Sequence, residues 1–347
     1  MTLRVGMYAH HQGLGHLQRC RAIATALAGS GEPVEVTILS SRPEADVVLP
    51  LDVEEGRDDY PEYSAGGTLH WAPLNVPGLR DRMAAIAGWV AENRPDVFFV
   101  DVSVEVCLLV RLLGVPVVTV AMPGRRTDAP HQLAYAQASA LIAGWPGEVP
   151  VPEDLVAHAD RLHTVGGISR FDTPEYRASA TVEVPEFSGD GARHAVVLQG
   201  QGGTAWTEDF WASVEQACPG WRFTVLGGSH RVENPLPYLA QADLVISAAG
   251  QNSVADIALA NTPAIFIPQD RAFDEQQATG TALESLSLAT VLQEPPAPEA
   301  WPSLLDRALS AGADWTRWQL PGAADRAAGV LRDTARQYSR AGIGGQA

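Results

Sequence analysis

Short apolar runs alternate with amphipathic segments through the first half of the chain. Residues 3–9 form an apolar run that predicts a buried strand, and residues 17–29 have the apolar spacing of a helix that ends in glycine. A second apolar run covers residues 33–41, and helix–proline–strand units follow at residues 79–103 and 105–123. Strands that alternate with helices at this pace predict a parallel, doubly wound sheet.

The same pattern starts again in the second half, where an apolar run at residues 194–203 leads into a glycine-rich turn. Alternating helix and strand patterns follow at residues 206–220, 221–229, 242–251, 252–262 and 263–269. Two halves that each begin with a strand and a glycine loop predict an α/β protein with two Rossmann-like, doubly wound parallel-sheet domains. The length of 347 residues also exceeds what one ordinary hydrophobic core contains.

The division between the domains is predicted at a double glycine within residues 162–171. This gives an N-terminal domain of residues 1–165, a C-terminal domain of residues 166–335 and a flexible tail of residues 336–347. Residues 170–193, where the periodicity is low, are the alternative boundary.

Composition excludes several classes of function. The formal net charge of −17 argues against binding to nucleic acid or to an anionic membrane surface. No lysine occurs in the chain, which excludes a Schiff base, a P-loop lysine and a Ser-Lys dyad. Scattered cysteines indicate reduced thiols, and we find neither a signal peptide nor an apolar run of membrane-spanning length. We therefore expect a cytoplasmic protein without an integral membrane segment, as a monomer or weak dimer.

The clearest binding pattern lies within residues 242–280. A predicted strand ends in a turn at Gly250 and Gln251, and a helix begins at Asn252 or Ser253, both of which are favoured as N-cap residues. The glycine allows a close approach of the backbone, and a helix N-terminus presents unpaired N–H groups with a partial positive charge. This combination predicts a site for a diphosphate group.

Polar side chains follow this helix start at positions that suit a sugar nucleotide. Asp256, one turn into the helix, is expected to accept hydrogen bonds from ribose hydroxyls. Gln269, Asp270, Gln276 and Gln277 follow the next strand, at the edge of the sheet where open α/β sheets bind ligands. Amides and carboxylates at this edge can bind the several hydroxyls of a sugar.

Over these residues the chain resembles the nucleotide-sugar glycosyltransferases of the GT-B architecture, in which two Rossmann-like domains face a central cleft. Within that architecture it is most similar to family 28, which includes the enzyme that adds N-acetylglucosamine to the lipid-linked peptidoglycan precursor. The resemblance covers most of the chain. It implies that Asp256, where the family usually has the longer Glu, binds the ribose, and that Gln276 and Gln277 bind the donor sugar.

The resemblance also implies donor contacts outside residues 242–280. It assigns an arginine near the diphosphate, a glycine loop, and a residue whose backbone contacts the uracil. These are Arg170, then Gly200, Gln201, Gly202 and Gly203, and finally Val232.

Three histidines and two glycines lie between the first predicted strand and helix. His10, His11 and His16 lack the i, i+4 spacing of a metal pair on one helix, so we expect no metal site, and His10 and His11 are predicted to be structural. Gly13, Gly15 and His16 resemble the first glycine loop of these transferases. They resemble equally the Gly-x-Gly-His-x-x-Arg-Cys start of nucleotide-sugar hydrolases of pseudaminic acid biosynthesis, whose histidine activates water.

His16 is therefore predicted to be the base that deprotonates an attacking hydroxyl, since an imidazole titrates near neutral pH. Helix N-termini, glycine-loop N–H groups and Arg170 are expected to stabilise the departing diphosphate without a metal. The prediction is a metal-independent, inverting transferase that uses a nucleotide-sugar, most simply a UDP-sugar, and no other cofactor. A nucleotide-sugar hydrolase and a non-catalytic nucleotide-binding protein are the alternatives.

Each of these residues also has a purely structural interpretation. A histidine at a helix start can cap or pack, a first-turn acid can complement the helix dipole, and paired glutamines can lie on a solvated face. Asp101, at the end of a predicted strand, is expected either to contact a ligand or His16 or to cap the next helix. Arg125 and Arg126 are expected to be exposed.

Overall fold

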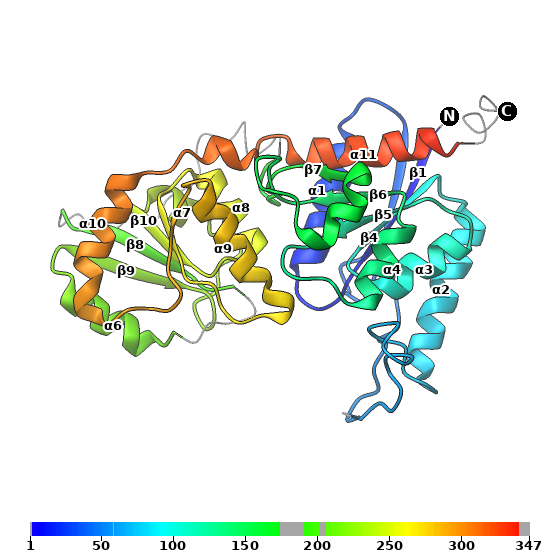
Figure 1. Cartoon of the computed structure of the whole chain (residues 1–347), viewed down its shortest axis with the longest axis horizontal. Helices are drawn as coiled ribbons and strands as arrows, with labels where there is room; N and C mark the ends of the chain where they lie inside the picture. Colours follow the sequence, from blue (N-terminus) through cyan, green and yellow to red (C-terminus); the bar gives the residue numbers. More distant parts are fainter. Residues whose placement is uncertain (1, 58, 174–190, 201–205, 340–347) are drawn as a thin grey trace.

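The computed structural model describes residues 2–57, 59–173, 191–200 and 206–339. It contains two parallel sheets, each flanked by helices, which lie side by side along the long axis of the molecule (Figure 1). This arrangement confirms the predicted α/β class with two doubly wound domains. No helix of the described part of the chain is both long and apolar enough to cross a membrane.

The N-terminal sheet has seven strands in the order β3-β2-β1-β4-β5-β6-β7. Its strands are β1 Leu3–Ala9, β2 Val34–Ser40, β3 Val47–Val48, β4 Val97–Asp101, β5 Val117–Ala121, β6 Ala140–Ala143 and β7 Leu162–Thr164. Its helices are α1 Gly15–Ala28, α2 Pro77–Asn93, α3 Val104–Leu112 and α4 Ala129–Gln137, with the 3₁₀ segment η1 Glu153–Arg161. The chain leaves β1 on one side towards β2 and returns on the other to β4, so the strand order reverses between β1 and β4. Open α/β sheets bind ligands at such a reversal.

The C-terminal sheet has five strands in the order β12-β11-β10-β8-β9. These are β8 Arg193–Leu198, β9 Trp221–Leu226, β10 Leu244–Ser247, β11 Ala264–Phe266 and β12 Thr290–Val291. Its helices are α6 Glu208–Ala217, α7 Leu236–Gln241, α8 Gln251–Ala260, α9 Glu275–Ser285 and α10 Trp301–Ala311, with the 3₁₀ segments η2 Ala272–Asp274, η3 Pro298–Ala300 and η4 Trp315–Trp318. Here the order reverses between β8 and β10, so the turns at Gly200 and Gly250 are at the second ligand-binding edge.

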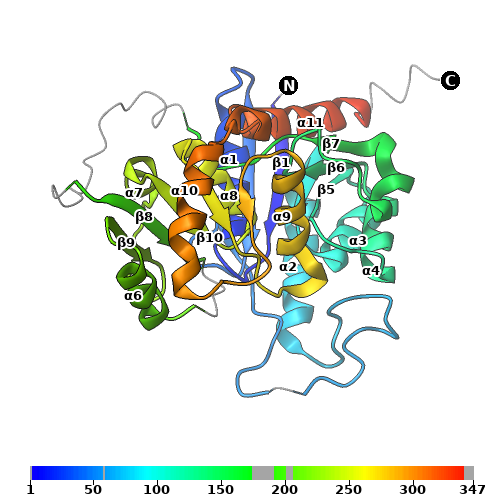
Figure 2. The same cartoon turned by 60° about the vertical axis from the view of Figure 1, so that its left-hand side comes forward.

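The last helix, α11 Ala323–Gln337, returns to the N-terminal domain and lies along α1 (Figures 1 and 2). Its alanines and Leu331 are part of the same hydrophobic core as Val5 and Phe99. The sequence places residues 323–335 with the C-terminal domain because they follow it in the chain. Their burial against the first sheet places them with the N-terminal domain instead.

Two segments therefore cross between the domains, and they are in contact. The first follows β7, and the second leads from η4 to α11. The backbone N–H of Gly167 donates a hydrogen bond to the carbonyl of Trp318 (3.3 Å), and Arg326 donates from Nε to the carbonyl of Val165 (2.9 Å). The predicted division after residue 165 lies in the first of these segments.

Candidate functional site

The sheet topology brings His16 and Asp101 together. Strands β1 and β4 are neighbours, and Ala9 pairs with Asp101 in their parallel register. Asp101 ends β4, while His16 lies in the first turn of α1, which follows β1. Nδ1 of His16 is 2.9 Å from Oδ1 of Asp101. A carboxylate at this distance favours the tautomer that has its proton on Nδ1, which leaves Nε2 with a free lone pair.

Asp101 is completely buried, and burial disfavours the charged form of a carboxyl group. Desolvation alone would raise the pKa of this carboxyl, but the charge of Arg19 and the interaction with His16, which includes a hydrogen bond, hold it below its ordinary value. Nη1 of Arg19 is 3.4 Å from Oδ1 of Asp101. The cap of α3 is Ser103, whose hydroxyl accepts the N–H of Val106, so Asp101 orients His16 and does not cap this helix.

The first turns of α1 and α8 are in contact across the two domains. Nη2 of Arg19 donates a hydrogen bond to Oε1 of Gln251, at 3.1 Å. Gly15 at the start of α1 lies against Asn252, because a Cβ there would overlap the end of the Asn252 side-chain amide and displace it. Two helix N-termini, each with unpaired N–H groups, are thereby directed to the same region of the cleft.

Helix α8 begins one or two residues earlier than the sequence predicts. Its N-cap is Gly250 and its first residue is Gln251, so Asn252 and Ser253 lie inside the first turn instead of capping it. The glycine at the cap is close to the first turn of α9, since a Cβ there would be 3.8 Å from Nε2 of Gln276.

Asp256 faces the interior of the C-terminal domain and pairs with a neighbouring hydroxyl. It is 7% exposed, and the hydroxyl of Ser169 donates a hydrogen bond of 2.7 Å to its Oδ1. Burial raises the pKa of Asp256 to about 6, opposed by Ser169 and by the charge of Arg170. Arg170 itself donates to the carbonyl of Glu233 (2.9 Å) and covers the ring of Phe171. Its buried Nε lacks a partner among the described residues.

The four polar residues after β11 form two hydrogen-bonded pairs. The backbone N–H of Gln269 donates to Oε1 of Gln276 at 2.8 Å, and Nε2 of Gln277 donates to Oδ1 of Asp270 at 3.2 Å. Oε1 of Gln277 is buried and has no partner in the described part of the chain. Such an acceptor is available to a ligand hydroxyl.

Gly200, Val232 and Gly13 are the remaining predicted site residues in the described part of the chain. Gly200 follows β8 and is exposed, and Val232 packs against the core of the C-terminal domain. Gly13 has a φ of +82°, which glycine adopts without strain. Gln201, Gly202 and Gly203 lie outside the described residues.

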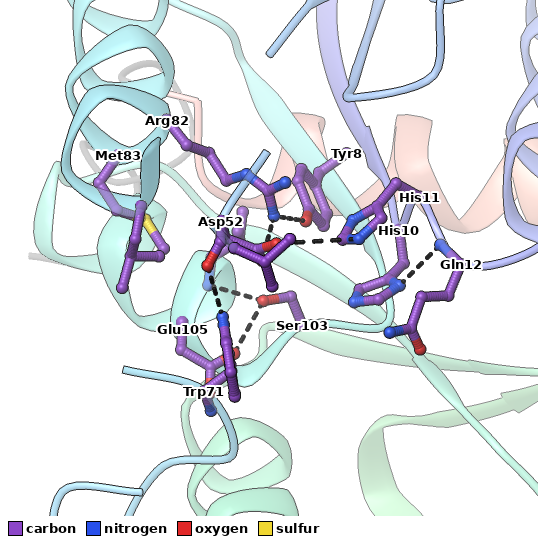
Figure 3. Close-up of a pocket in the computed structure, with 13 residues that line it drawn as sticks. Tyr8, His10, His11, Gln12, Asp52, Trp71, Arg82, Met83, Ser103 and Glu105 are labelled. Carbon is purple, nitrogen blue, oxygen red and sulfur yellow. Dashed lines mark hydrogen bonds and ion pairs between the residues drawn. The ribbon is translucent and has the colours of Figure 1, made fainter. Parts of the chain in front are cut away.

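A cavity of about 570 Å³ lies between the domains beside these residues. Gly124, Arg125 and Trp145 line it from the N-terminal domain, and Gln251 and Gln277 line it from the C-terminal domain. A second cavity, of about 270 Å³, lies in the N-terminal domain next to His10 and His11 (Figure 3). His10 stacks on His11 with a ring separation of 4.7 Å and meets the ring of His16 edge-on at 5.9 Å.

The sequence gives no indication of a cluster around Arg126. Arg126 is expected to be exposed but is 4% exposed, because its guanidinium donates to the carbonyl of Pro123, to His131 Nε2 (3.1 Å) and to Glu275 (3.2 Å) across the cleft. Asp128 joins the cluster through His131 Nδ1, at 2.7 Å. These partners come from the loop after β5, from α4 and its cap, and from the start of α9, and neither spacing nor periodicity brings them together in the sequence.

His70, Asp128 and His131 have ligand atoms close enough to hold a metal ion. The hydrogen bonds favour a different arrangement. Because Arg126 donates to Nε2 of His131, the neutral imidazole has its proton on Nδ1, directed at Asp128. Nδ1 of His131 then has no lone pair for a cation, so this group is an ordinary hydrogen-bonded cluster.

Residues 225–310 match the model of the glycosyltransferase family 28 C-terminal domain. No curated protein matches the chain in sequence. Among solved structures, the glycotransferase of kitacinnamycin is similar in fold, with a TM-score of 0.66 and 16% identity over 96% of this chain and 98% of that chain. MurG from Acinetobacter baumannii has a TM-score of 0.61 and 17% identity over 95% of this chain and 99% of that chain.

A putative UDP-N-acetylglucosamine 2-epimerase from Listeria monocytogenes is also similar, with a TM-score of 0.64 and 11% identity over 98% of both chains. The fold thus occurs with more than one chemistry. The matched segment contains Gly250, Asp256 and the Gln276–Gln277 pair. Residues 225–310 therefore resemble a glycosyltransferase family 28 C-terminal domain, and the whole chain shares its two-domain fold with solved GT-B glycosyltransferases.

Proposed function

We propose that this protein transfers a sugar from a nucleotide-sugar donor, with UDP as the expected leaving group, to a hydroxyl of an acceptor. The observation that carries the proposal is the pair formed by His16 and Asp101 at the edge of the sheet that faces the C-terminal domain. A buried carboxylate that holds one ring nitrogen leaves the other free to accept a proton, as general base catalysis requires.

The donor is assigned to the C-terminal side of the cleft. The first turn of α8 supplies backbone N–H groups for the diphosphate, and Arg170 lies near Asp256 with an unpaired Nε. The carboxamide of Gln277 has a free, buried acceptor oxygen for a sugar hydroxyl. The resemblance to family 28 enzymes implies the same positions for the donor, which supports the assignment.

In the proposed reaction, Nε2 of His16 accepts the proton of the acceptor hydroxyl. The oxygen forms its bond to the anomeric carbon as the bond to the diphosphate breaks, and the nucleoside diphosphate leaves with the bonding electrons. A single displacement inverts the anomeric configuration. Donors from the helix N-termini and Arg170 stabilise the charge on the leaving group, which is the task that a divalent cation performs in other transferases.

The test begins with thermal shifts in the presence of UDP, TDP, GDP and ADP, followed by turnover of the matching nucleotide-sugars. We expect release of the nucleoside diphosphate only when a hydroxyl acceptor is present, unchanged by a chelator, with a product of inverted configuration. An activity that is lost on chelation and restored by manganese would contradict metal independence.

A nucleotide-sugar hydrolase is the second candidate, because residues 13–20 fit the Gly-x-Gly-His-x-x-Arg-Cys pattern of such hydrolases. Stoichiometric release of free sugar and nucleoside diphosphate without an acceptor would favour the hydrolase over the transferase. A sugar nucleotide that is recovered with altered configuration would favour an epimerase.

A further inference from the structure

The N-terminal cavity of about 270 Å³ adjoins the proposed base through His10. Its walls come from the loop after β1, the loop after β3, helix α2 and the start of α3 (Figure 3). A ligand in this cavity would lie on the N-terminal side of the cleft, opposite the residues assigned to the donor. Its chemistry therefore defines the acceptor, and the inference that follows rests on the proposed transferase function.

The positive charge in the wall is already neutralised. Arg82 is 2% exposed and forms an ion pair with the buried Asp52. Its guanidinium also donates to the hydroxyls of Tyr8 (3.2 Å) and Ser41 (2.6 Å) and to the carbonyl of Pro50 (2.9 Å). An anionic ligand would have to break this network, and an uncompensated buried charge is costly.

Both carboxylate oxygens of Glu105 accept hydrogen bonds, in this case from neutral donors. Its Oε1 accepts the backbone N–H groups of His70 (2.8 Å) and Trp71 (2.9 Å), and its Oε2 accepts the hydroxyl of Ser103 (3.0 Å). The indole N–H of Trp71 donates to the carbonyl of Asp52 at 3.0 Å. A cationic ligand would therefore have to displace one of these neutral donors to reach the carboxylate of Glu105.

Apolar surface and one polar atom remain for a ligand. Trp71, Leu79, Met83 and Val53 contribute the apolar part of the wall. Among the described residues that line the cavity, Nδ1 of His11 is the buried side-chain atom that lacks a hydrogen-bond partner. Burial lowers the pKa of His11, so the imidazole is neutral near pH 7.

We propose that this cavity binds the acceptor, and that the acceptor is a compact, neutral, ring-containing hydroxyl compound. Its ring packs between Trp71 and Met83, and a second polar group on the ring bonds to Nδ1 of His11. The volume is below the usual range of about 300–1,000 Å³ for small-molecule sites, which suits one or two fused rings. The closed network of Arg82 disfavours phosphorylated acceptors, the size disfavours long-chain ones, and a cationic acceptor would have to displace the neutral donors of Glu105.

Equilibrium binding of 2-naphthol, compared with 2-naphthyl phosphate, tests the proposal on the intact protein. We expect 2-naphthol to bind, and the phosphate to bind at least tenfold more weakly. Met83→Trp fills the cavity and is expected to weaken 2-naphthol binding at least tenfold, as is Val53→Trp, whose position is 43% exposed and tolerates a larger side chain. Leu112→Trp, at a position of α3 that is 76% exposed, is the matched control and should change binding less than twofold.

His11→Phe tests the single polar contact. It keeps a flat ring beside His10 but removes Nδ1, so 2,7-dihydroxynaphthalene should lose about 3- to 10-fold in affinity while 2-naphthol changes little. The proposal is overturned if 2-naphthol does not bind, if the phosphate binds as tightly, or if neither Trp variant weakens binding. The UDP thermal shift is measured in parallel. Failure of UDP, TDP, GDP and ADP alike to bind, with the 2-naphthol pattern intact, would refute the transfer reaction but not the cavity's selectivity.

Discussion

Nδ1 of His16 and Oδ1 of Asp101 lie 2.9 Å apart although 85 residues separate them in the chain. Their contact follows from the pairing of β1 with β4, which aligns Ala9 with Asp101. Arg19 extends the pair to Gln251 of the other domain. The proposed base and the proposed donor site are thus connected by a short chain of side chains.

Removal of the base should abolish most turnover without loss of the fold. His16→Ala is expected to lower kcat by about 10²–10⁴-fold, the usual contribution of a general base. The UDP thermal shift should be retained, because the donor contacts are on α8 and α9. His163→Ala, at an exposed histidine of β7, is the matched control.

Asp101→Asn should lower kcat with little change in the KM of the donor. An amide keeps the shape of the carboxylate but stabilises neither the Nδ1–H tautomer nor the imidazolium that forms on proton transfer. The pH dependence of kcat should change with it, which a purely structural role would not produce. Full activity of Asp101→Asn would refute the orienting role.

Asp256 predicts a pH dependence of stability. Its pKa of about 6 in the folded protein exceeds the ordinary value near 3.9. Below both pKa values Asp256 is protonated in the folded and in the unfolded protein, so it does not change the free energy of unfolding. As the pH rises from about 4 to 6, the carboxyl group ionises first in the unfolded chain, so the free energy of unfolding falls. Asp256→Asn, which can still accept the hydroxyl of Ser169, should therefore be more stable than the parent above pH 6, by at most about 3 kcal/mol.

The measurement is the unfolding free energy of both proteins between pH 4 and pH 8. The difference between the two free energies should grow from pH 4 to about pH 6 and level off above that. A constant difference, or a variant that is less stable at pH 7, would show that the carboxylate is charged in the folded protein without penalty.

The alternation of strands and helices, the two-domain architecture and the turns that precede His16 and follow β10 at Gly250 could all be predicted from sequence. These features depend on local periodicity and on turn residues, which the sequence records directly. The partner of His16 could not be assigned in the same way. Asp101 was equally compatible with a helix cap, and only the order of the strands in the sheet decides between the two roles.

The position of the last helix shows the same limit. The alanine-rich face of α11 predicts burial but does not say against which sheet, because both domains present apolar faces. The buried state of Arg126 likewise depends on Glu275, which is 149 residues away. Contacts of this kind depend on how the two domains pack together, so no hydrophobic periodicity in the sequence indicates them.

Helix α11 should contribute directly to the stability of the N-terminal domain. Leu331 is fully buried in the core that includes Val5 and Phe99, so Leu331→Ala is expected to cost about 2–5 kcal/mol. Amide exchange in α1 and β4 should accelerate, whereas exchange in β8 and β10 should not. Asp333→Ala, on the exposed side of the same helix, should change stability by less than about 0.5 kcal/mol. Equal acceleration in both sheets would argue against this assignment.

Phe273 joins the domains through an unusual backbone conformation. Its φ is +63°, its carbonyl accepts the N–H of Arg125 (2.8 Å), and its ring meets His131 at 4.8 Å and lies under the guanidinium of Arg126 at 4.7 Å. Phe273→Ala removes the ring but keeps a strained residue, whereas Phe273→Gly removes both the ring and the strain. Both variants should increase the radius of gyration in solution, and the glycine variant should be more stable than the alanine variant by about 1 kcal/mol. Unchanged dimensions would mean that the other contacts between the domains, such as Arg126 with Glu275 and Arg19 with Gln251, are sufficient to hold them together. Equal stabilities would mean that the backbone relaxes when the ring is lost.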